Sequence, residues 1–417
     1  MEKTIKMGKE KGKPHVVITA MNRYSYFQWF ILGFYYLEKE GKIDLSFKVR
    51  SLYERLSFLN RSKLMTGFRR YAVKHGVSVR WLFKYSNNLE GYVLHNGDKR
   101  YFCIDSNDNP FSFDSELLDK VSVYYKMQCP KVFSEDGFHL TDDVVIPWID
   151  QNIERNPKSE KVRKPCENLI KNIGKIRPLM VGTRLMSRGN AFRWLDESFR
   201  NSMASSSVLA EKKMMCYFGN AQGPVPVKSE PVDLDREAQI VGYFGDKTNH
   251  PNEKRAKAAK IMRGMGDGYD ARVIDETEPG FKNRVSHPEL VVPIERFCDH
   301  ISHFQYNLNI SGYGMSIPNR FIESFLVGTA IVTDRLSLRW YKPFGPEVVE
   351  TVPMGYLPMD QVNWEGFEKD IKNLPDVDKT TVLNAFNEKW HPRKVAEYIL
   401  EEVLKCNNEK TDTMKKI

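Results

Sequence analysis

The amino-acid sequence lacks the cysteine and histidine spacings that bind metal ions. Its six cysteines are scattered without a C-x-x-C pair, and its nine histidines show neither H-x3-H nor H-E-x-x-H spacing. Thiolates and imidazoles at such spacings are the usual ligands of zinc. The sequence therefore predicts no metal site. The scattered cysteines also predict no disulfide framework and favour a reducing compartment.

Long apolar runs and targeting segments are also missing. The longest aromatic and apolar run, residues 26–37, is too short for a bilayer, which takes about 20 residues in a helix. Residues 1–13 are rich in lysine and lack the apolar stretch of a signal peptide. We therefore expect a cytoplasmic protein without a membrane-spanning segment.

Several nucleotide-binding and hydrolytic motifs are absent. The first half contains no G-x-G-x-x-G sequence, which excludes the usual dinucleotide fingerprint there. Neither a G-x-S-x-G elbow nor a G-x4-G-K-[ST] loop occurs in the chain. These absences argue against a serine hydrolase and a P-loop ATPase.

Positive charge is what the sequence has in excess. Its 63 lysines and arginines outnumber its 54 acidic residues, and the formal net charge is +9. Such a charge favours nucleic acid, an anionic membrane surface or a phosphate-bearing substrate as partner. The cations are spread along the chain rather than clustered among aromatics, so no nucleic-acid partner is expected. A peripheral position on the inner membrane face stays open.

The first half alternates predicted strands and helices. With 417 residues, 41% of them hydrophobic, the chain is long enough for two domains. Asn96-Gly97-Asp98 predicts a tight hairpin, because this turn needs positive φ. This order of predicted strands and helices along the chain is typical of the first domain of an α/β protein. The predicted strands are 15–19, 43–49, 91–94, 99–104 and 121–127, and the predicted helices are 26–40 and 115–120.

A polar loop follows the second strand of that hairpin. Asp105 comes directly after the apolar residues Phe102–Ile104, and Asp108 lies in the same loop. A carboxylate at a strand end can act as the general base that takes a proton from an attacking hydroxyl. Partial burial would raise the pKa of Asp105, so we place it ahead of Asp108 as the catalytic candidate. The alternative is an Asx-rich turn that only precedes the next helix.

The clearest pattern in the second half is a strand, a glycine loop, a helix and a second strand within residues 304–340. Ser316 is expected to cap the helix and Gly328 to end it. Parallel sheets of this kind bind ligands at the carboxyl ends of their strands, beside helix N-termini that suit phosphate. The two predicted strands are 305–309 and 330–333, and the loop is 311–314.

This unit resembles the nucleotide-sugar signature of GT-B glycosyltransferases, P-x4-E-x4-G-T-x-x-V-x-D. The Gly-Tyr-Gly-Met-Ser run before it, together with Arg320, is more similar to the exostosin-type and CAP10-type branches, although Ser316 and Arg320 are spaced wider than usual. The resemblance implies an α/β fold of two Rossmann-like domains that face a cleft. The matching residues are Pro318, Glu323, Gly328, Thr329, Val332 and Asp334.

The resemblance also implies roles for single residues. Glu323 would hold the ribose of the sugar donor, and the loop with Gly312 and Gly314 would lie over its diphosphate. The alternative is that Arg320 and Glu323 only pair on an exposed helix face. The other donor-binding candidates are Ser316, Asn319, Arg320 and Lys247.

Lysines in the second half are candidates for contact with the leaving diphosphate. Metal-free sugar transfer needs a cation there, because negative charge develops as the nucleotide departs. Lys247 follows a predicted strand, residues 239–244, and is placed for this role. Lys254 and Arg255 lie in the first turn of a predicted helix, residues 252–265, where we expect exposed side chains.

The predicted organisation is an acceptor-binding domain over residues 1–205 and a donor-binding domain over residues 206–388. Pro392 opens an amphipathic helix within residues 389–407, which the resemblance returns to the first domain. Residues 408–417 are expected to be a disordered tail.

The sequence therefore predicts a glycosyltransferase that needs no metal or other cofactor. It would move a sugar from a nucleotide sugar to a hydroxyl of a glycan or lipid-linked glycan, in the synthesis of surface polysaccharide or glycoconjugate. Two alternatives stay open. One is a nucleotide-sugar epimerase on the same fold, and the other is a non-catalytic basic protein that binds glycan or nucleic acid.

Overall fold

The computed structural model describes most of both predicted halves of the chain. The predicted domain boundary after residue 205 and the predicted tail lie outside the described residues. The described residues are 12–21, 24–48, 88–139, 145–151, 165–183, 251–266, 298, 301–311, 315–355 and 357–406.

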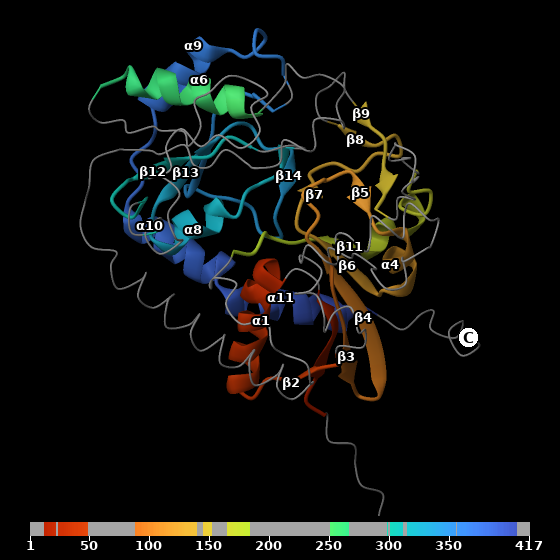
Figure 1. The fold of residues 1–417 in the computed structure, drawn as a ribbon. Helices are drawn as coiled ribbons and strands as arrows, with labels where there is room; N and C mark the ends of the chain where they lie inside the picture. The colour runs from red at the N-terminus through yellow and green to blue at the C-terminus, as the bar shows by residue number, and fades with distance from the viewer. Residues whose placement is uncertain are drawn as a thin grey trace, which may run out of the picture.

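A six-stranded sheet forms the centre of the first half, in the order β11-β6-β4-β3-β1-β2 (Figure 1). β1 pairs with β2, β4 with β6, and β6 with β11 in parallel, whereas β3 is antiparallel to both of its neighbours. The chain is therefore a mixed α/β protein. The strands are β1 (His15–Met21), β2 (Asp44–Phe47), β3 (Asn88–His95), β4 (Asp98–Asp105), β6 (Val123–Lys126) and β11 (Ile176–Pro178).

The predicted hairpin explains the reversed strand. Asn96 and Gly97 have positive φ values of 52° and 86°, as a two-residue hairpin turn requires. This turn reverses the chain, so β3 and β4 must pair antiparallel. The sheet of the first half is therefore mixed and differs from the purely parallel sheet of a Rossmann-like domain.

Short elements complete the first half. β5 pairs with β10, and β8 with β9, as two small two-stranded sheets. A short 3-10 helix begins at Ile170 and leads into β11. The elements are α1 (Tyr24–Lys39), α4 (Ser115–Lys120), η2 (Ile170–Lys175), β5 (Ser112–Phe113), β8 (Phe138–His139), β9 (Val145–Ile146) and β10 (Ile149–Asp150).

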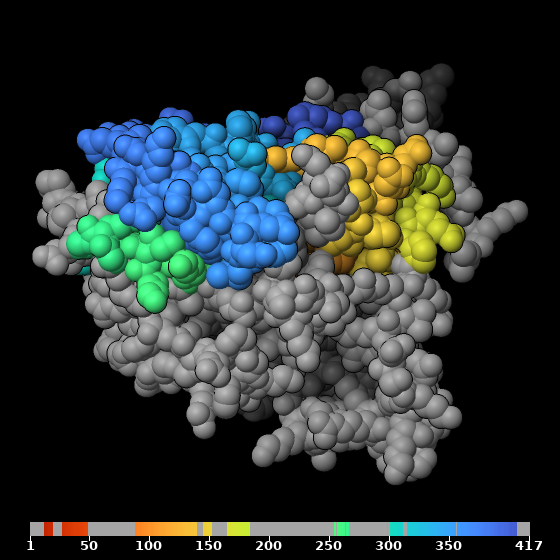
Figure 2. All heavy atoms as spheres, turned by 90° about the horizontal axis from the view of Figure 1, so that it is seen from above, coloured from red at the N-terminus to blue at the C-terminus, as the bar shows by residue number. Residues whose placement is uncertain are grey.

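The second half contains a three-stranded parallel sheet, β12-β13-β15, between two layers of helices. Helices α8 and α10 lie on one side of this sheet, and α6 and α9 on the other (Figure 1). Seen from above, α6 lies directly beside the surface that includes α9 (Figure 2). The elements are β12 (Tyr306–Leu308), β13 (Ala330–Thr333), β15 (Val348–Glu350), α6 (Pro251–Arg263), α8 (Arg320–Leu326), α9 (Trp364–Lys372), α10 (Lys379–Ala385) and the π-helix η6 (Phe386–Trp390).

Helix α8 begins later than the sequence predicts. Its N-cap residue is Asn319, so the prediction that Ser316 caps the helix is wrong. The reason lies in Ile317, whose backbone N–H and C=O both bind the side-chain amide of Gln128 at 2.9 Å. These contacts hold Ile317 outside the helix. Gly328 follows the helix with a φ of 76°, as predicted for its end.

The helix expected from Pro392 is present as α11 (Pro392–Lys405) and packs against α1 of the first half (Figure 1). Gly33 of α1 permits this contact, because a Cβ atom there would lie 2.2 Å from the carbonyl oxygen of Pro392. Tyr125 of β6 donates to the carbonyl oxygen of Ile399 at 2.7 Å. The C-terminal helix thus completes the core of the first half. Among the described residues, no helix has the length and apolar character needed to cross a bilayer.

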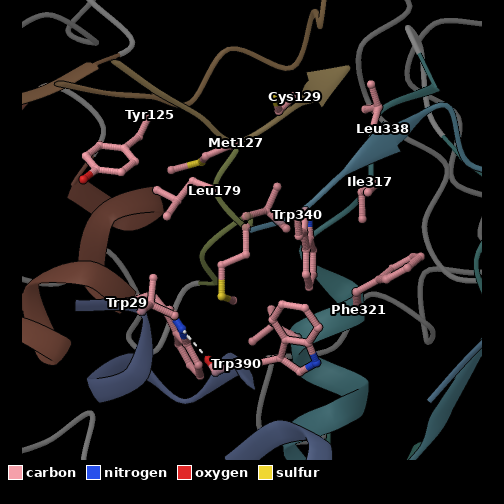
Figure 3. Close-up of a cluster of buried hydrophobic side chains, with 14 of the residues drawn as sticks. Trp29, Tyr125, Met127, Cys129, Leu179, Ile317, Phe321, Leu338, Trp340 and Trp390 are labelled. Atoms are coloured by element: carbon pink, nitrogen blue, oxygen red, sulfur yellow. Dashed lines mark hydrogen bonds between the residues drawn. The ribbon is translucent and has the colours of Figure 1, made fainter. Parts of the chain in front are cut away.

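Strand pairing and aromatic packing join the two halves. β7 (Cys129–Pro130) pairs antiparallel with β14 (Leu338–Arg339), although the two strands are far apart in the sequence. Beside this pair, Trp340 packs against Trp390 with ring centroids 5.0 Å apart (Figure 3). Trp29 of α1 donates to the carbonyl oxygen of Trp390 at 3.1 Å.

A partly buried histidine begins α11 at this junction. His391 is the N-cap residue, and its Nδ1 accepts a hydrogen bond from the backbone N–H of Arg393 at 3.2 Å. Its ring also packs near those of Tyr36 and Phe386. Burial, with the positive charges of Arg393 and Lys394, lowers the pKa of His391 to about 4.

We predict that the free energy of unfolding falls as the pH drops from about 6.5 to 4. In this range the unfolded chain binds a proton at His391 that the folded protein excludes. One pKa unit corresponds to about 1.4 kcal/mol, so the loss at pH 4 is about 2–3 kcal/mol. Urea unfolding at pH 7 and pH 4 measures it. His391→Asn keeps a cap that does not titrate and should lose less stability. An equal loss in both proteins would assign the effect to another group.

Candidate functional site

The carboxyl ends of β12, β13 and β15 lie at one edge of the second sheet, because the three strands are parallel. Asp334 directly follows β13 and is completely buried. Its carboxylate accepts hydrogen bonds from the backbone N–H of Ser311 at 2.8 Å, the Ser311 hydroxyl at 2.9 Å and the backbone N–H of Gly355 at 2.9 Å. Asp334 thus connects the segments that follow all three strands.

Two cations from α6 reach the same edge. Lys254 is 1% exposed, and its Nζ donates to the carbonyl oxygens of Met354, at 3.1 Å, and Gly355. Arg255 is 8% exposed, and its Nη2 donates to the carbonyl oxygen of Ile310 at 3.1 Å. The sequence predicts both side chains to be exposed, and this prediction is wrong.

The pattern of α6 contains the signal that would have placed these cations inside. Apolar residues recur four and seven or eight positions after each of them, which puts all of these residues on one helix face. Lys257 and Lys260 lie on the opposite face and are exposed. The buried residues of α6 that the structure describes are Lys254, Arg255, Ala258, Ala259 and Met262.

Two peptide groups at this strand edge each lie between a buried cation and the buried carboxylate of Asp334. In the peptide group between Ile310 and Ser311, the carbonyl oxygen accepts a hydrogen bond from Arg255 and the N–H donates one to Asp334. In the peptide group between Met354 and Gly355, the carbonyl oxygen accepts a hydrogen bond from Lys254 and the N–H donates one to the same carboxylate. A cation at the oxygen and an anion at the N–H both match the dipole of a peptide group. The edge is therefore fixed electrostatically.

Glu323 of α8 lies between the two halves. It is 5% exposed, and its Oε1 accepts hydrogen bonds from the Thr183 hydroxyl at 2.7 Å and from Asn319 Nδ2 at 2.9 Å. The alternative that Glu323 lies on an exposed helix face is wrong, because every residue from Phe321 to Leu326 is buried. Contact with the first half covers the polar side of this short helix. Glu323 thus faces the segment that follows β11.

The other donor-binding candidates are only partly brought together. Asn319 directly contacts Glu323, whereas Ser316, which precedes α8, and Arg320, the first residue of α8, are half-buried. Three further candidates, Gly312, Gly314 and Lys247, lie outside the described residues.

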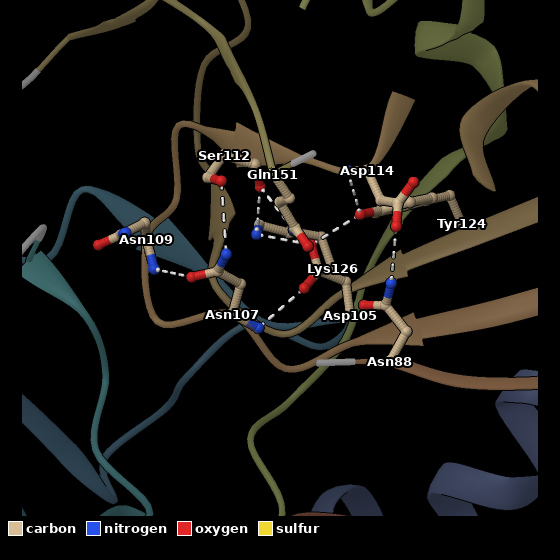
Figure 4. A network of polar contacts seen from close by, with 9 residues as sticks. All are labelled: Asn88, Asp105, Asn107, Asn109, Ser112, Asp114, Tyr124, Lys126 and Gln151. Carbon is tan, nitrogen blue, oxygen red and sulfur yellow. Dashed lines mark hydrogen bonds and ion pairs between the residues drawn. The ribbon is translucent and has the colours of Figure 1, made fainter. Parts of the chain in front are cut away.

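Asp105, the first candidate for the catalytic base, lies inside the first half (Figure 4). It forms an ion pair with Lys126 at 2.8 Å, and both side chains have no exposed surface. The same carboxylate accepts hydrogen bonds from the Tyr124 hydroxyl at 2.7 Å, Gln151 Nε2 at 2.8 Å and the backbone N–H of Asn107 at 2.8 Å. Four donors thus surround this carboxylate.

These contacts give Asp105 a structural role. Burial, with the charge of Asp105, raises the pKa of Tyr124 well above its usual value, so its hydroxyl stays a donor. Lys126 also donates to the carbonyl oxygen of Ser112 at 2.8 Å, which fixes the loop after β4. A general base must reach its substrate, and Asp105 is enclosed, so we correct this assignment. Asp108, half-buried in the same loop, stays the candidate.

The part of the chain that the structure describes offers little to a metal ion. Among the described residues, no group of three or more histidine, cysteine, aspartate or glutamate side chains could hold one. The chain does contain a D-x-D spacing at Asp376 and Asp378, a pattern that metal-dependent glycosyltransferases of another fold use. Here Asp376 accepts a hydrogen bond from Gln305, and Asp378 caps α10 through the backbone N–H of Thr381. A second such spacing, at Asp233 and Asp235, lies outside the described residues.

Comparisons with known proteins add no relative. No protein-family model matches the chain. A search of curated proteins and a search of solved structures found no match either.

We predict that Lys126→Met lowers the free energy of unfolding by about 3–5 kcal/mol, because it leaves the Asp105 carboxylate buried without its cation. Urea unfolding at neutral pH measures this loss. The double variant with Asp105→Asn removes the uncompensated charge and should recover part of the stability. A loss below about 1 kcal/mol in the single variant would show that solvent reaches Asp105.

Proposed function

We propose that the protein is a GT-B-like glycosyltransferase that binds a nucleotide-sugar donor at the carboxyl edge of β12, β13 and β15. The observation that carries this proposal is the presence of two buried cations, Lys254 and Arg255, at that edge. A parallel sheet offers its ligand site at the carboxyl edge, and buried cations there suit the phosphates of a nucleotide. The motif residues Asp334 and Glu323 belong to the same half.

The proposed roles follow from position. Lys254 and Arg255, held at carbonyl oxygens of the strand-end loops, place positive charge beside the diphosphate as it leaves. Asp334 keeps the two loops in place for it. Glu323 takes the ribose hydroxyls, with Thr183 and Asn319 orienting its carboxylate. The buried setting strengthens each of these electrostatic contacts.

The acceptor belongs to the first half in this proposal, as a hydroxyl of a glycan or lipid-linked glycan. An inverting transfer needs a base for that hydroxyl, and Asp108 is the candidate that the geometry leaves. The net charge of +9 suits an acceptor held at an anionic membrane surface.

We predict that Lys254→Gln weakens nucleoside diphosphate binding by about tenfold to a hundredfold. Glutamine still donates to the carbonyl oxygens of Met354 and Gly355 but has no charge, and hydrogen bonds to charged groups contribute about 1.5–3 kcal/mol. A thermal-shift panel of nucleoside diphosphates and nucleotide sugars first identifies the ligand. A ligand at a hundred times its Kd adds about 2.7 kcal/mol of stability. Titration calorimetry then compares the variants.

Lys257→Gln is the matched control, because it makes the same charge change on the exposed face of the same helix. It should leave the affinity within about twofold of the wild type, since exposed charges interact weakly through solvent. Equal losses in the two variants would point to a general effect of net charge. A panel in which no nucleotide stabilises the wild type would overturn the proposed function.

Transfer should also continue in excess chelator. The cations at the strand edge supply the charge that a metal supplies in other glycosyltransferases. Release of nucleoside diphosphate from the identified donor, measured with and without chelator, tests this. Activity that chelator abolishes and manganese or magnesium restores would contradict it. The products also separate the proposal from an epimerase, which would return an isomerised nucleotide sugar instead of a nucleoside diphosphate.

A further inference from the structure

Asn309 provides a buried side-chain hydrogen-bond donor at the same strand edge. It directly follows β12 and is 4% exposed. Its side-chain Nδ2 makes no hydrogen bond within the described part of the chain. A buried amide that lacks a partner costs about 1–3 kcal/mol, and such groups are rare in folded proteins. This one therefore requires an explanation.

The backbone on both sides of Asn309 is held in place. Its own N–H donates to the carbonyl oxygen of Val332 at 2.7 Å. The next two residues are fixed by charge, Ile310 through Arg255 and Ser311 through Asp334. The backbone thus cannot shift to bring Nδ2 to another acceptor without breaking these contacts.

The alternation of β12 shows on which side the carboxamide lies. Side chains two residues apart point to the same face of a strand. Asn307 points toward α8, because its Nδ2 donates to the Ser324 hydroxyl at 2.9 Å. Asn309 shares that face and lies about 6.6 Å further along the strand, past the last strand residue. Its donor therefore lies between the sheet and the start of α8, where ligands of parallel sheets bind.

We infer that Asn309 Nδ2 donates a hydrogen bond to an anionic oxygen of a phosphate-bearing ligand at this edge. The ligand class rests on the proposed function, and the buried cations beside Ile310 and Gly355 favour it independently of any sugar. Bound ligand supplies the acceptor that the described residues lack. Asn309 is then a ligand-contacting residue whose donor is in place before the ligand arrives.

The inference predicts opposite effects on affinity and stability. Asn309→Leu replaces the unpaired donor by an apolar side chain of similar size, so the ligand-free protein should melt at or above the wild-type temperature. Its Kd for inorganic pyrophosphate should rise about tenfold or more, the loss of one charge-assisted hydrogen bond. A residue that only serves the fold would lower the melting temperature and leave the Kd unchanged.

Asn307→Leu is the matched control on the same face. It removes a made hydrogen bond to Ser324 in the strand interior, so it should lower the melting temperature and leave the Kd for pyrophosphate within about twofold. Inorganic pyrophosphate is the probe because it carries phosphate oxygens without base or sugar. Differential scanning fluorimetry gives the melting temperatures, and titration calorimetry gives the Kd.

Two results would overturn the inference. One is a wild type that does not bind pyrophosphate, and the other is an unchanged Kd in Asn309→Leu. If Asn309→Leu lowers both the affinity and the melting temperature, Asn309→Asp decides, because it keeps the size and adds a repelling charge. A wild-type Kd in Asn309→Asp refutes the contact, and a loss of tenfold or more supports it. If pyrophosphate binding depends on Asn309 but the protein transfers no sugar, the proposed glycosyltransferase function is refuted and the Asn309 contact stands.

Discussion

The buried carboxylate of Asp334 is the contact on which the second half depends. It takes the N–H groups of Ser311 and Gly355, while Arg255 and Lys254 bind the carbonyl oxygens of the peptides that contain those N–H groups. A buried charge is costly unless neighbouring dipoles and charges compensate it. Here the peptide dipoles provide that compensation. The consequence is a strand edge whose loops and buried cations are fixed in place.

The two halves are held together by contacts of a different kind. Backbone groups pair β7 with β14, and the side-chain amide of Gln128 makes two hydrogen bonds to the backbone of Ile317. Such directional contacts fix the orientation of the two halves. The aromatic cluster around Trp390 adds apolar burial, and α11 extends that burial onto α1. Because Glu323 contacts Thr183 across this junction, the position of Glu323 and the packing of the halves are coupled. A change at either one is therefore expected to reach the other.

The loop after β4 shows how a residue that looks catalytic in the sequence can have a structural role instead. Asp105 stands at a strand end after an apolar run, a setting that also suits a general base. Lys126 comes from the neighbouring parallel strand in register with it, so their side chains meet in the core. Burial then favours pairing over catalysis, because a charge without access to solvent needs a fixed counter-charge.

The sequence by itself determined what depends on neighbours along the chain. The Asn96-Gly97 turn, the bounds of α4 and β13, the final helix from Pro392 and the end of α8 at Gly328 follow from local conformational preference and hydrophobic periodicity. The tertiary structure alone decided which polar residues became buried. Lys254, Arg255 and Glu323 each lie on a helix that looks partly exposed in isolation, and their partners come from distant loops or the other half. The two-residue strands β7 and β14 are likewise too short to show a period, and only their meeting across the junction makes them strands.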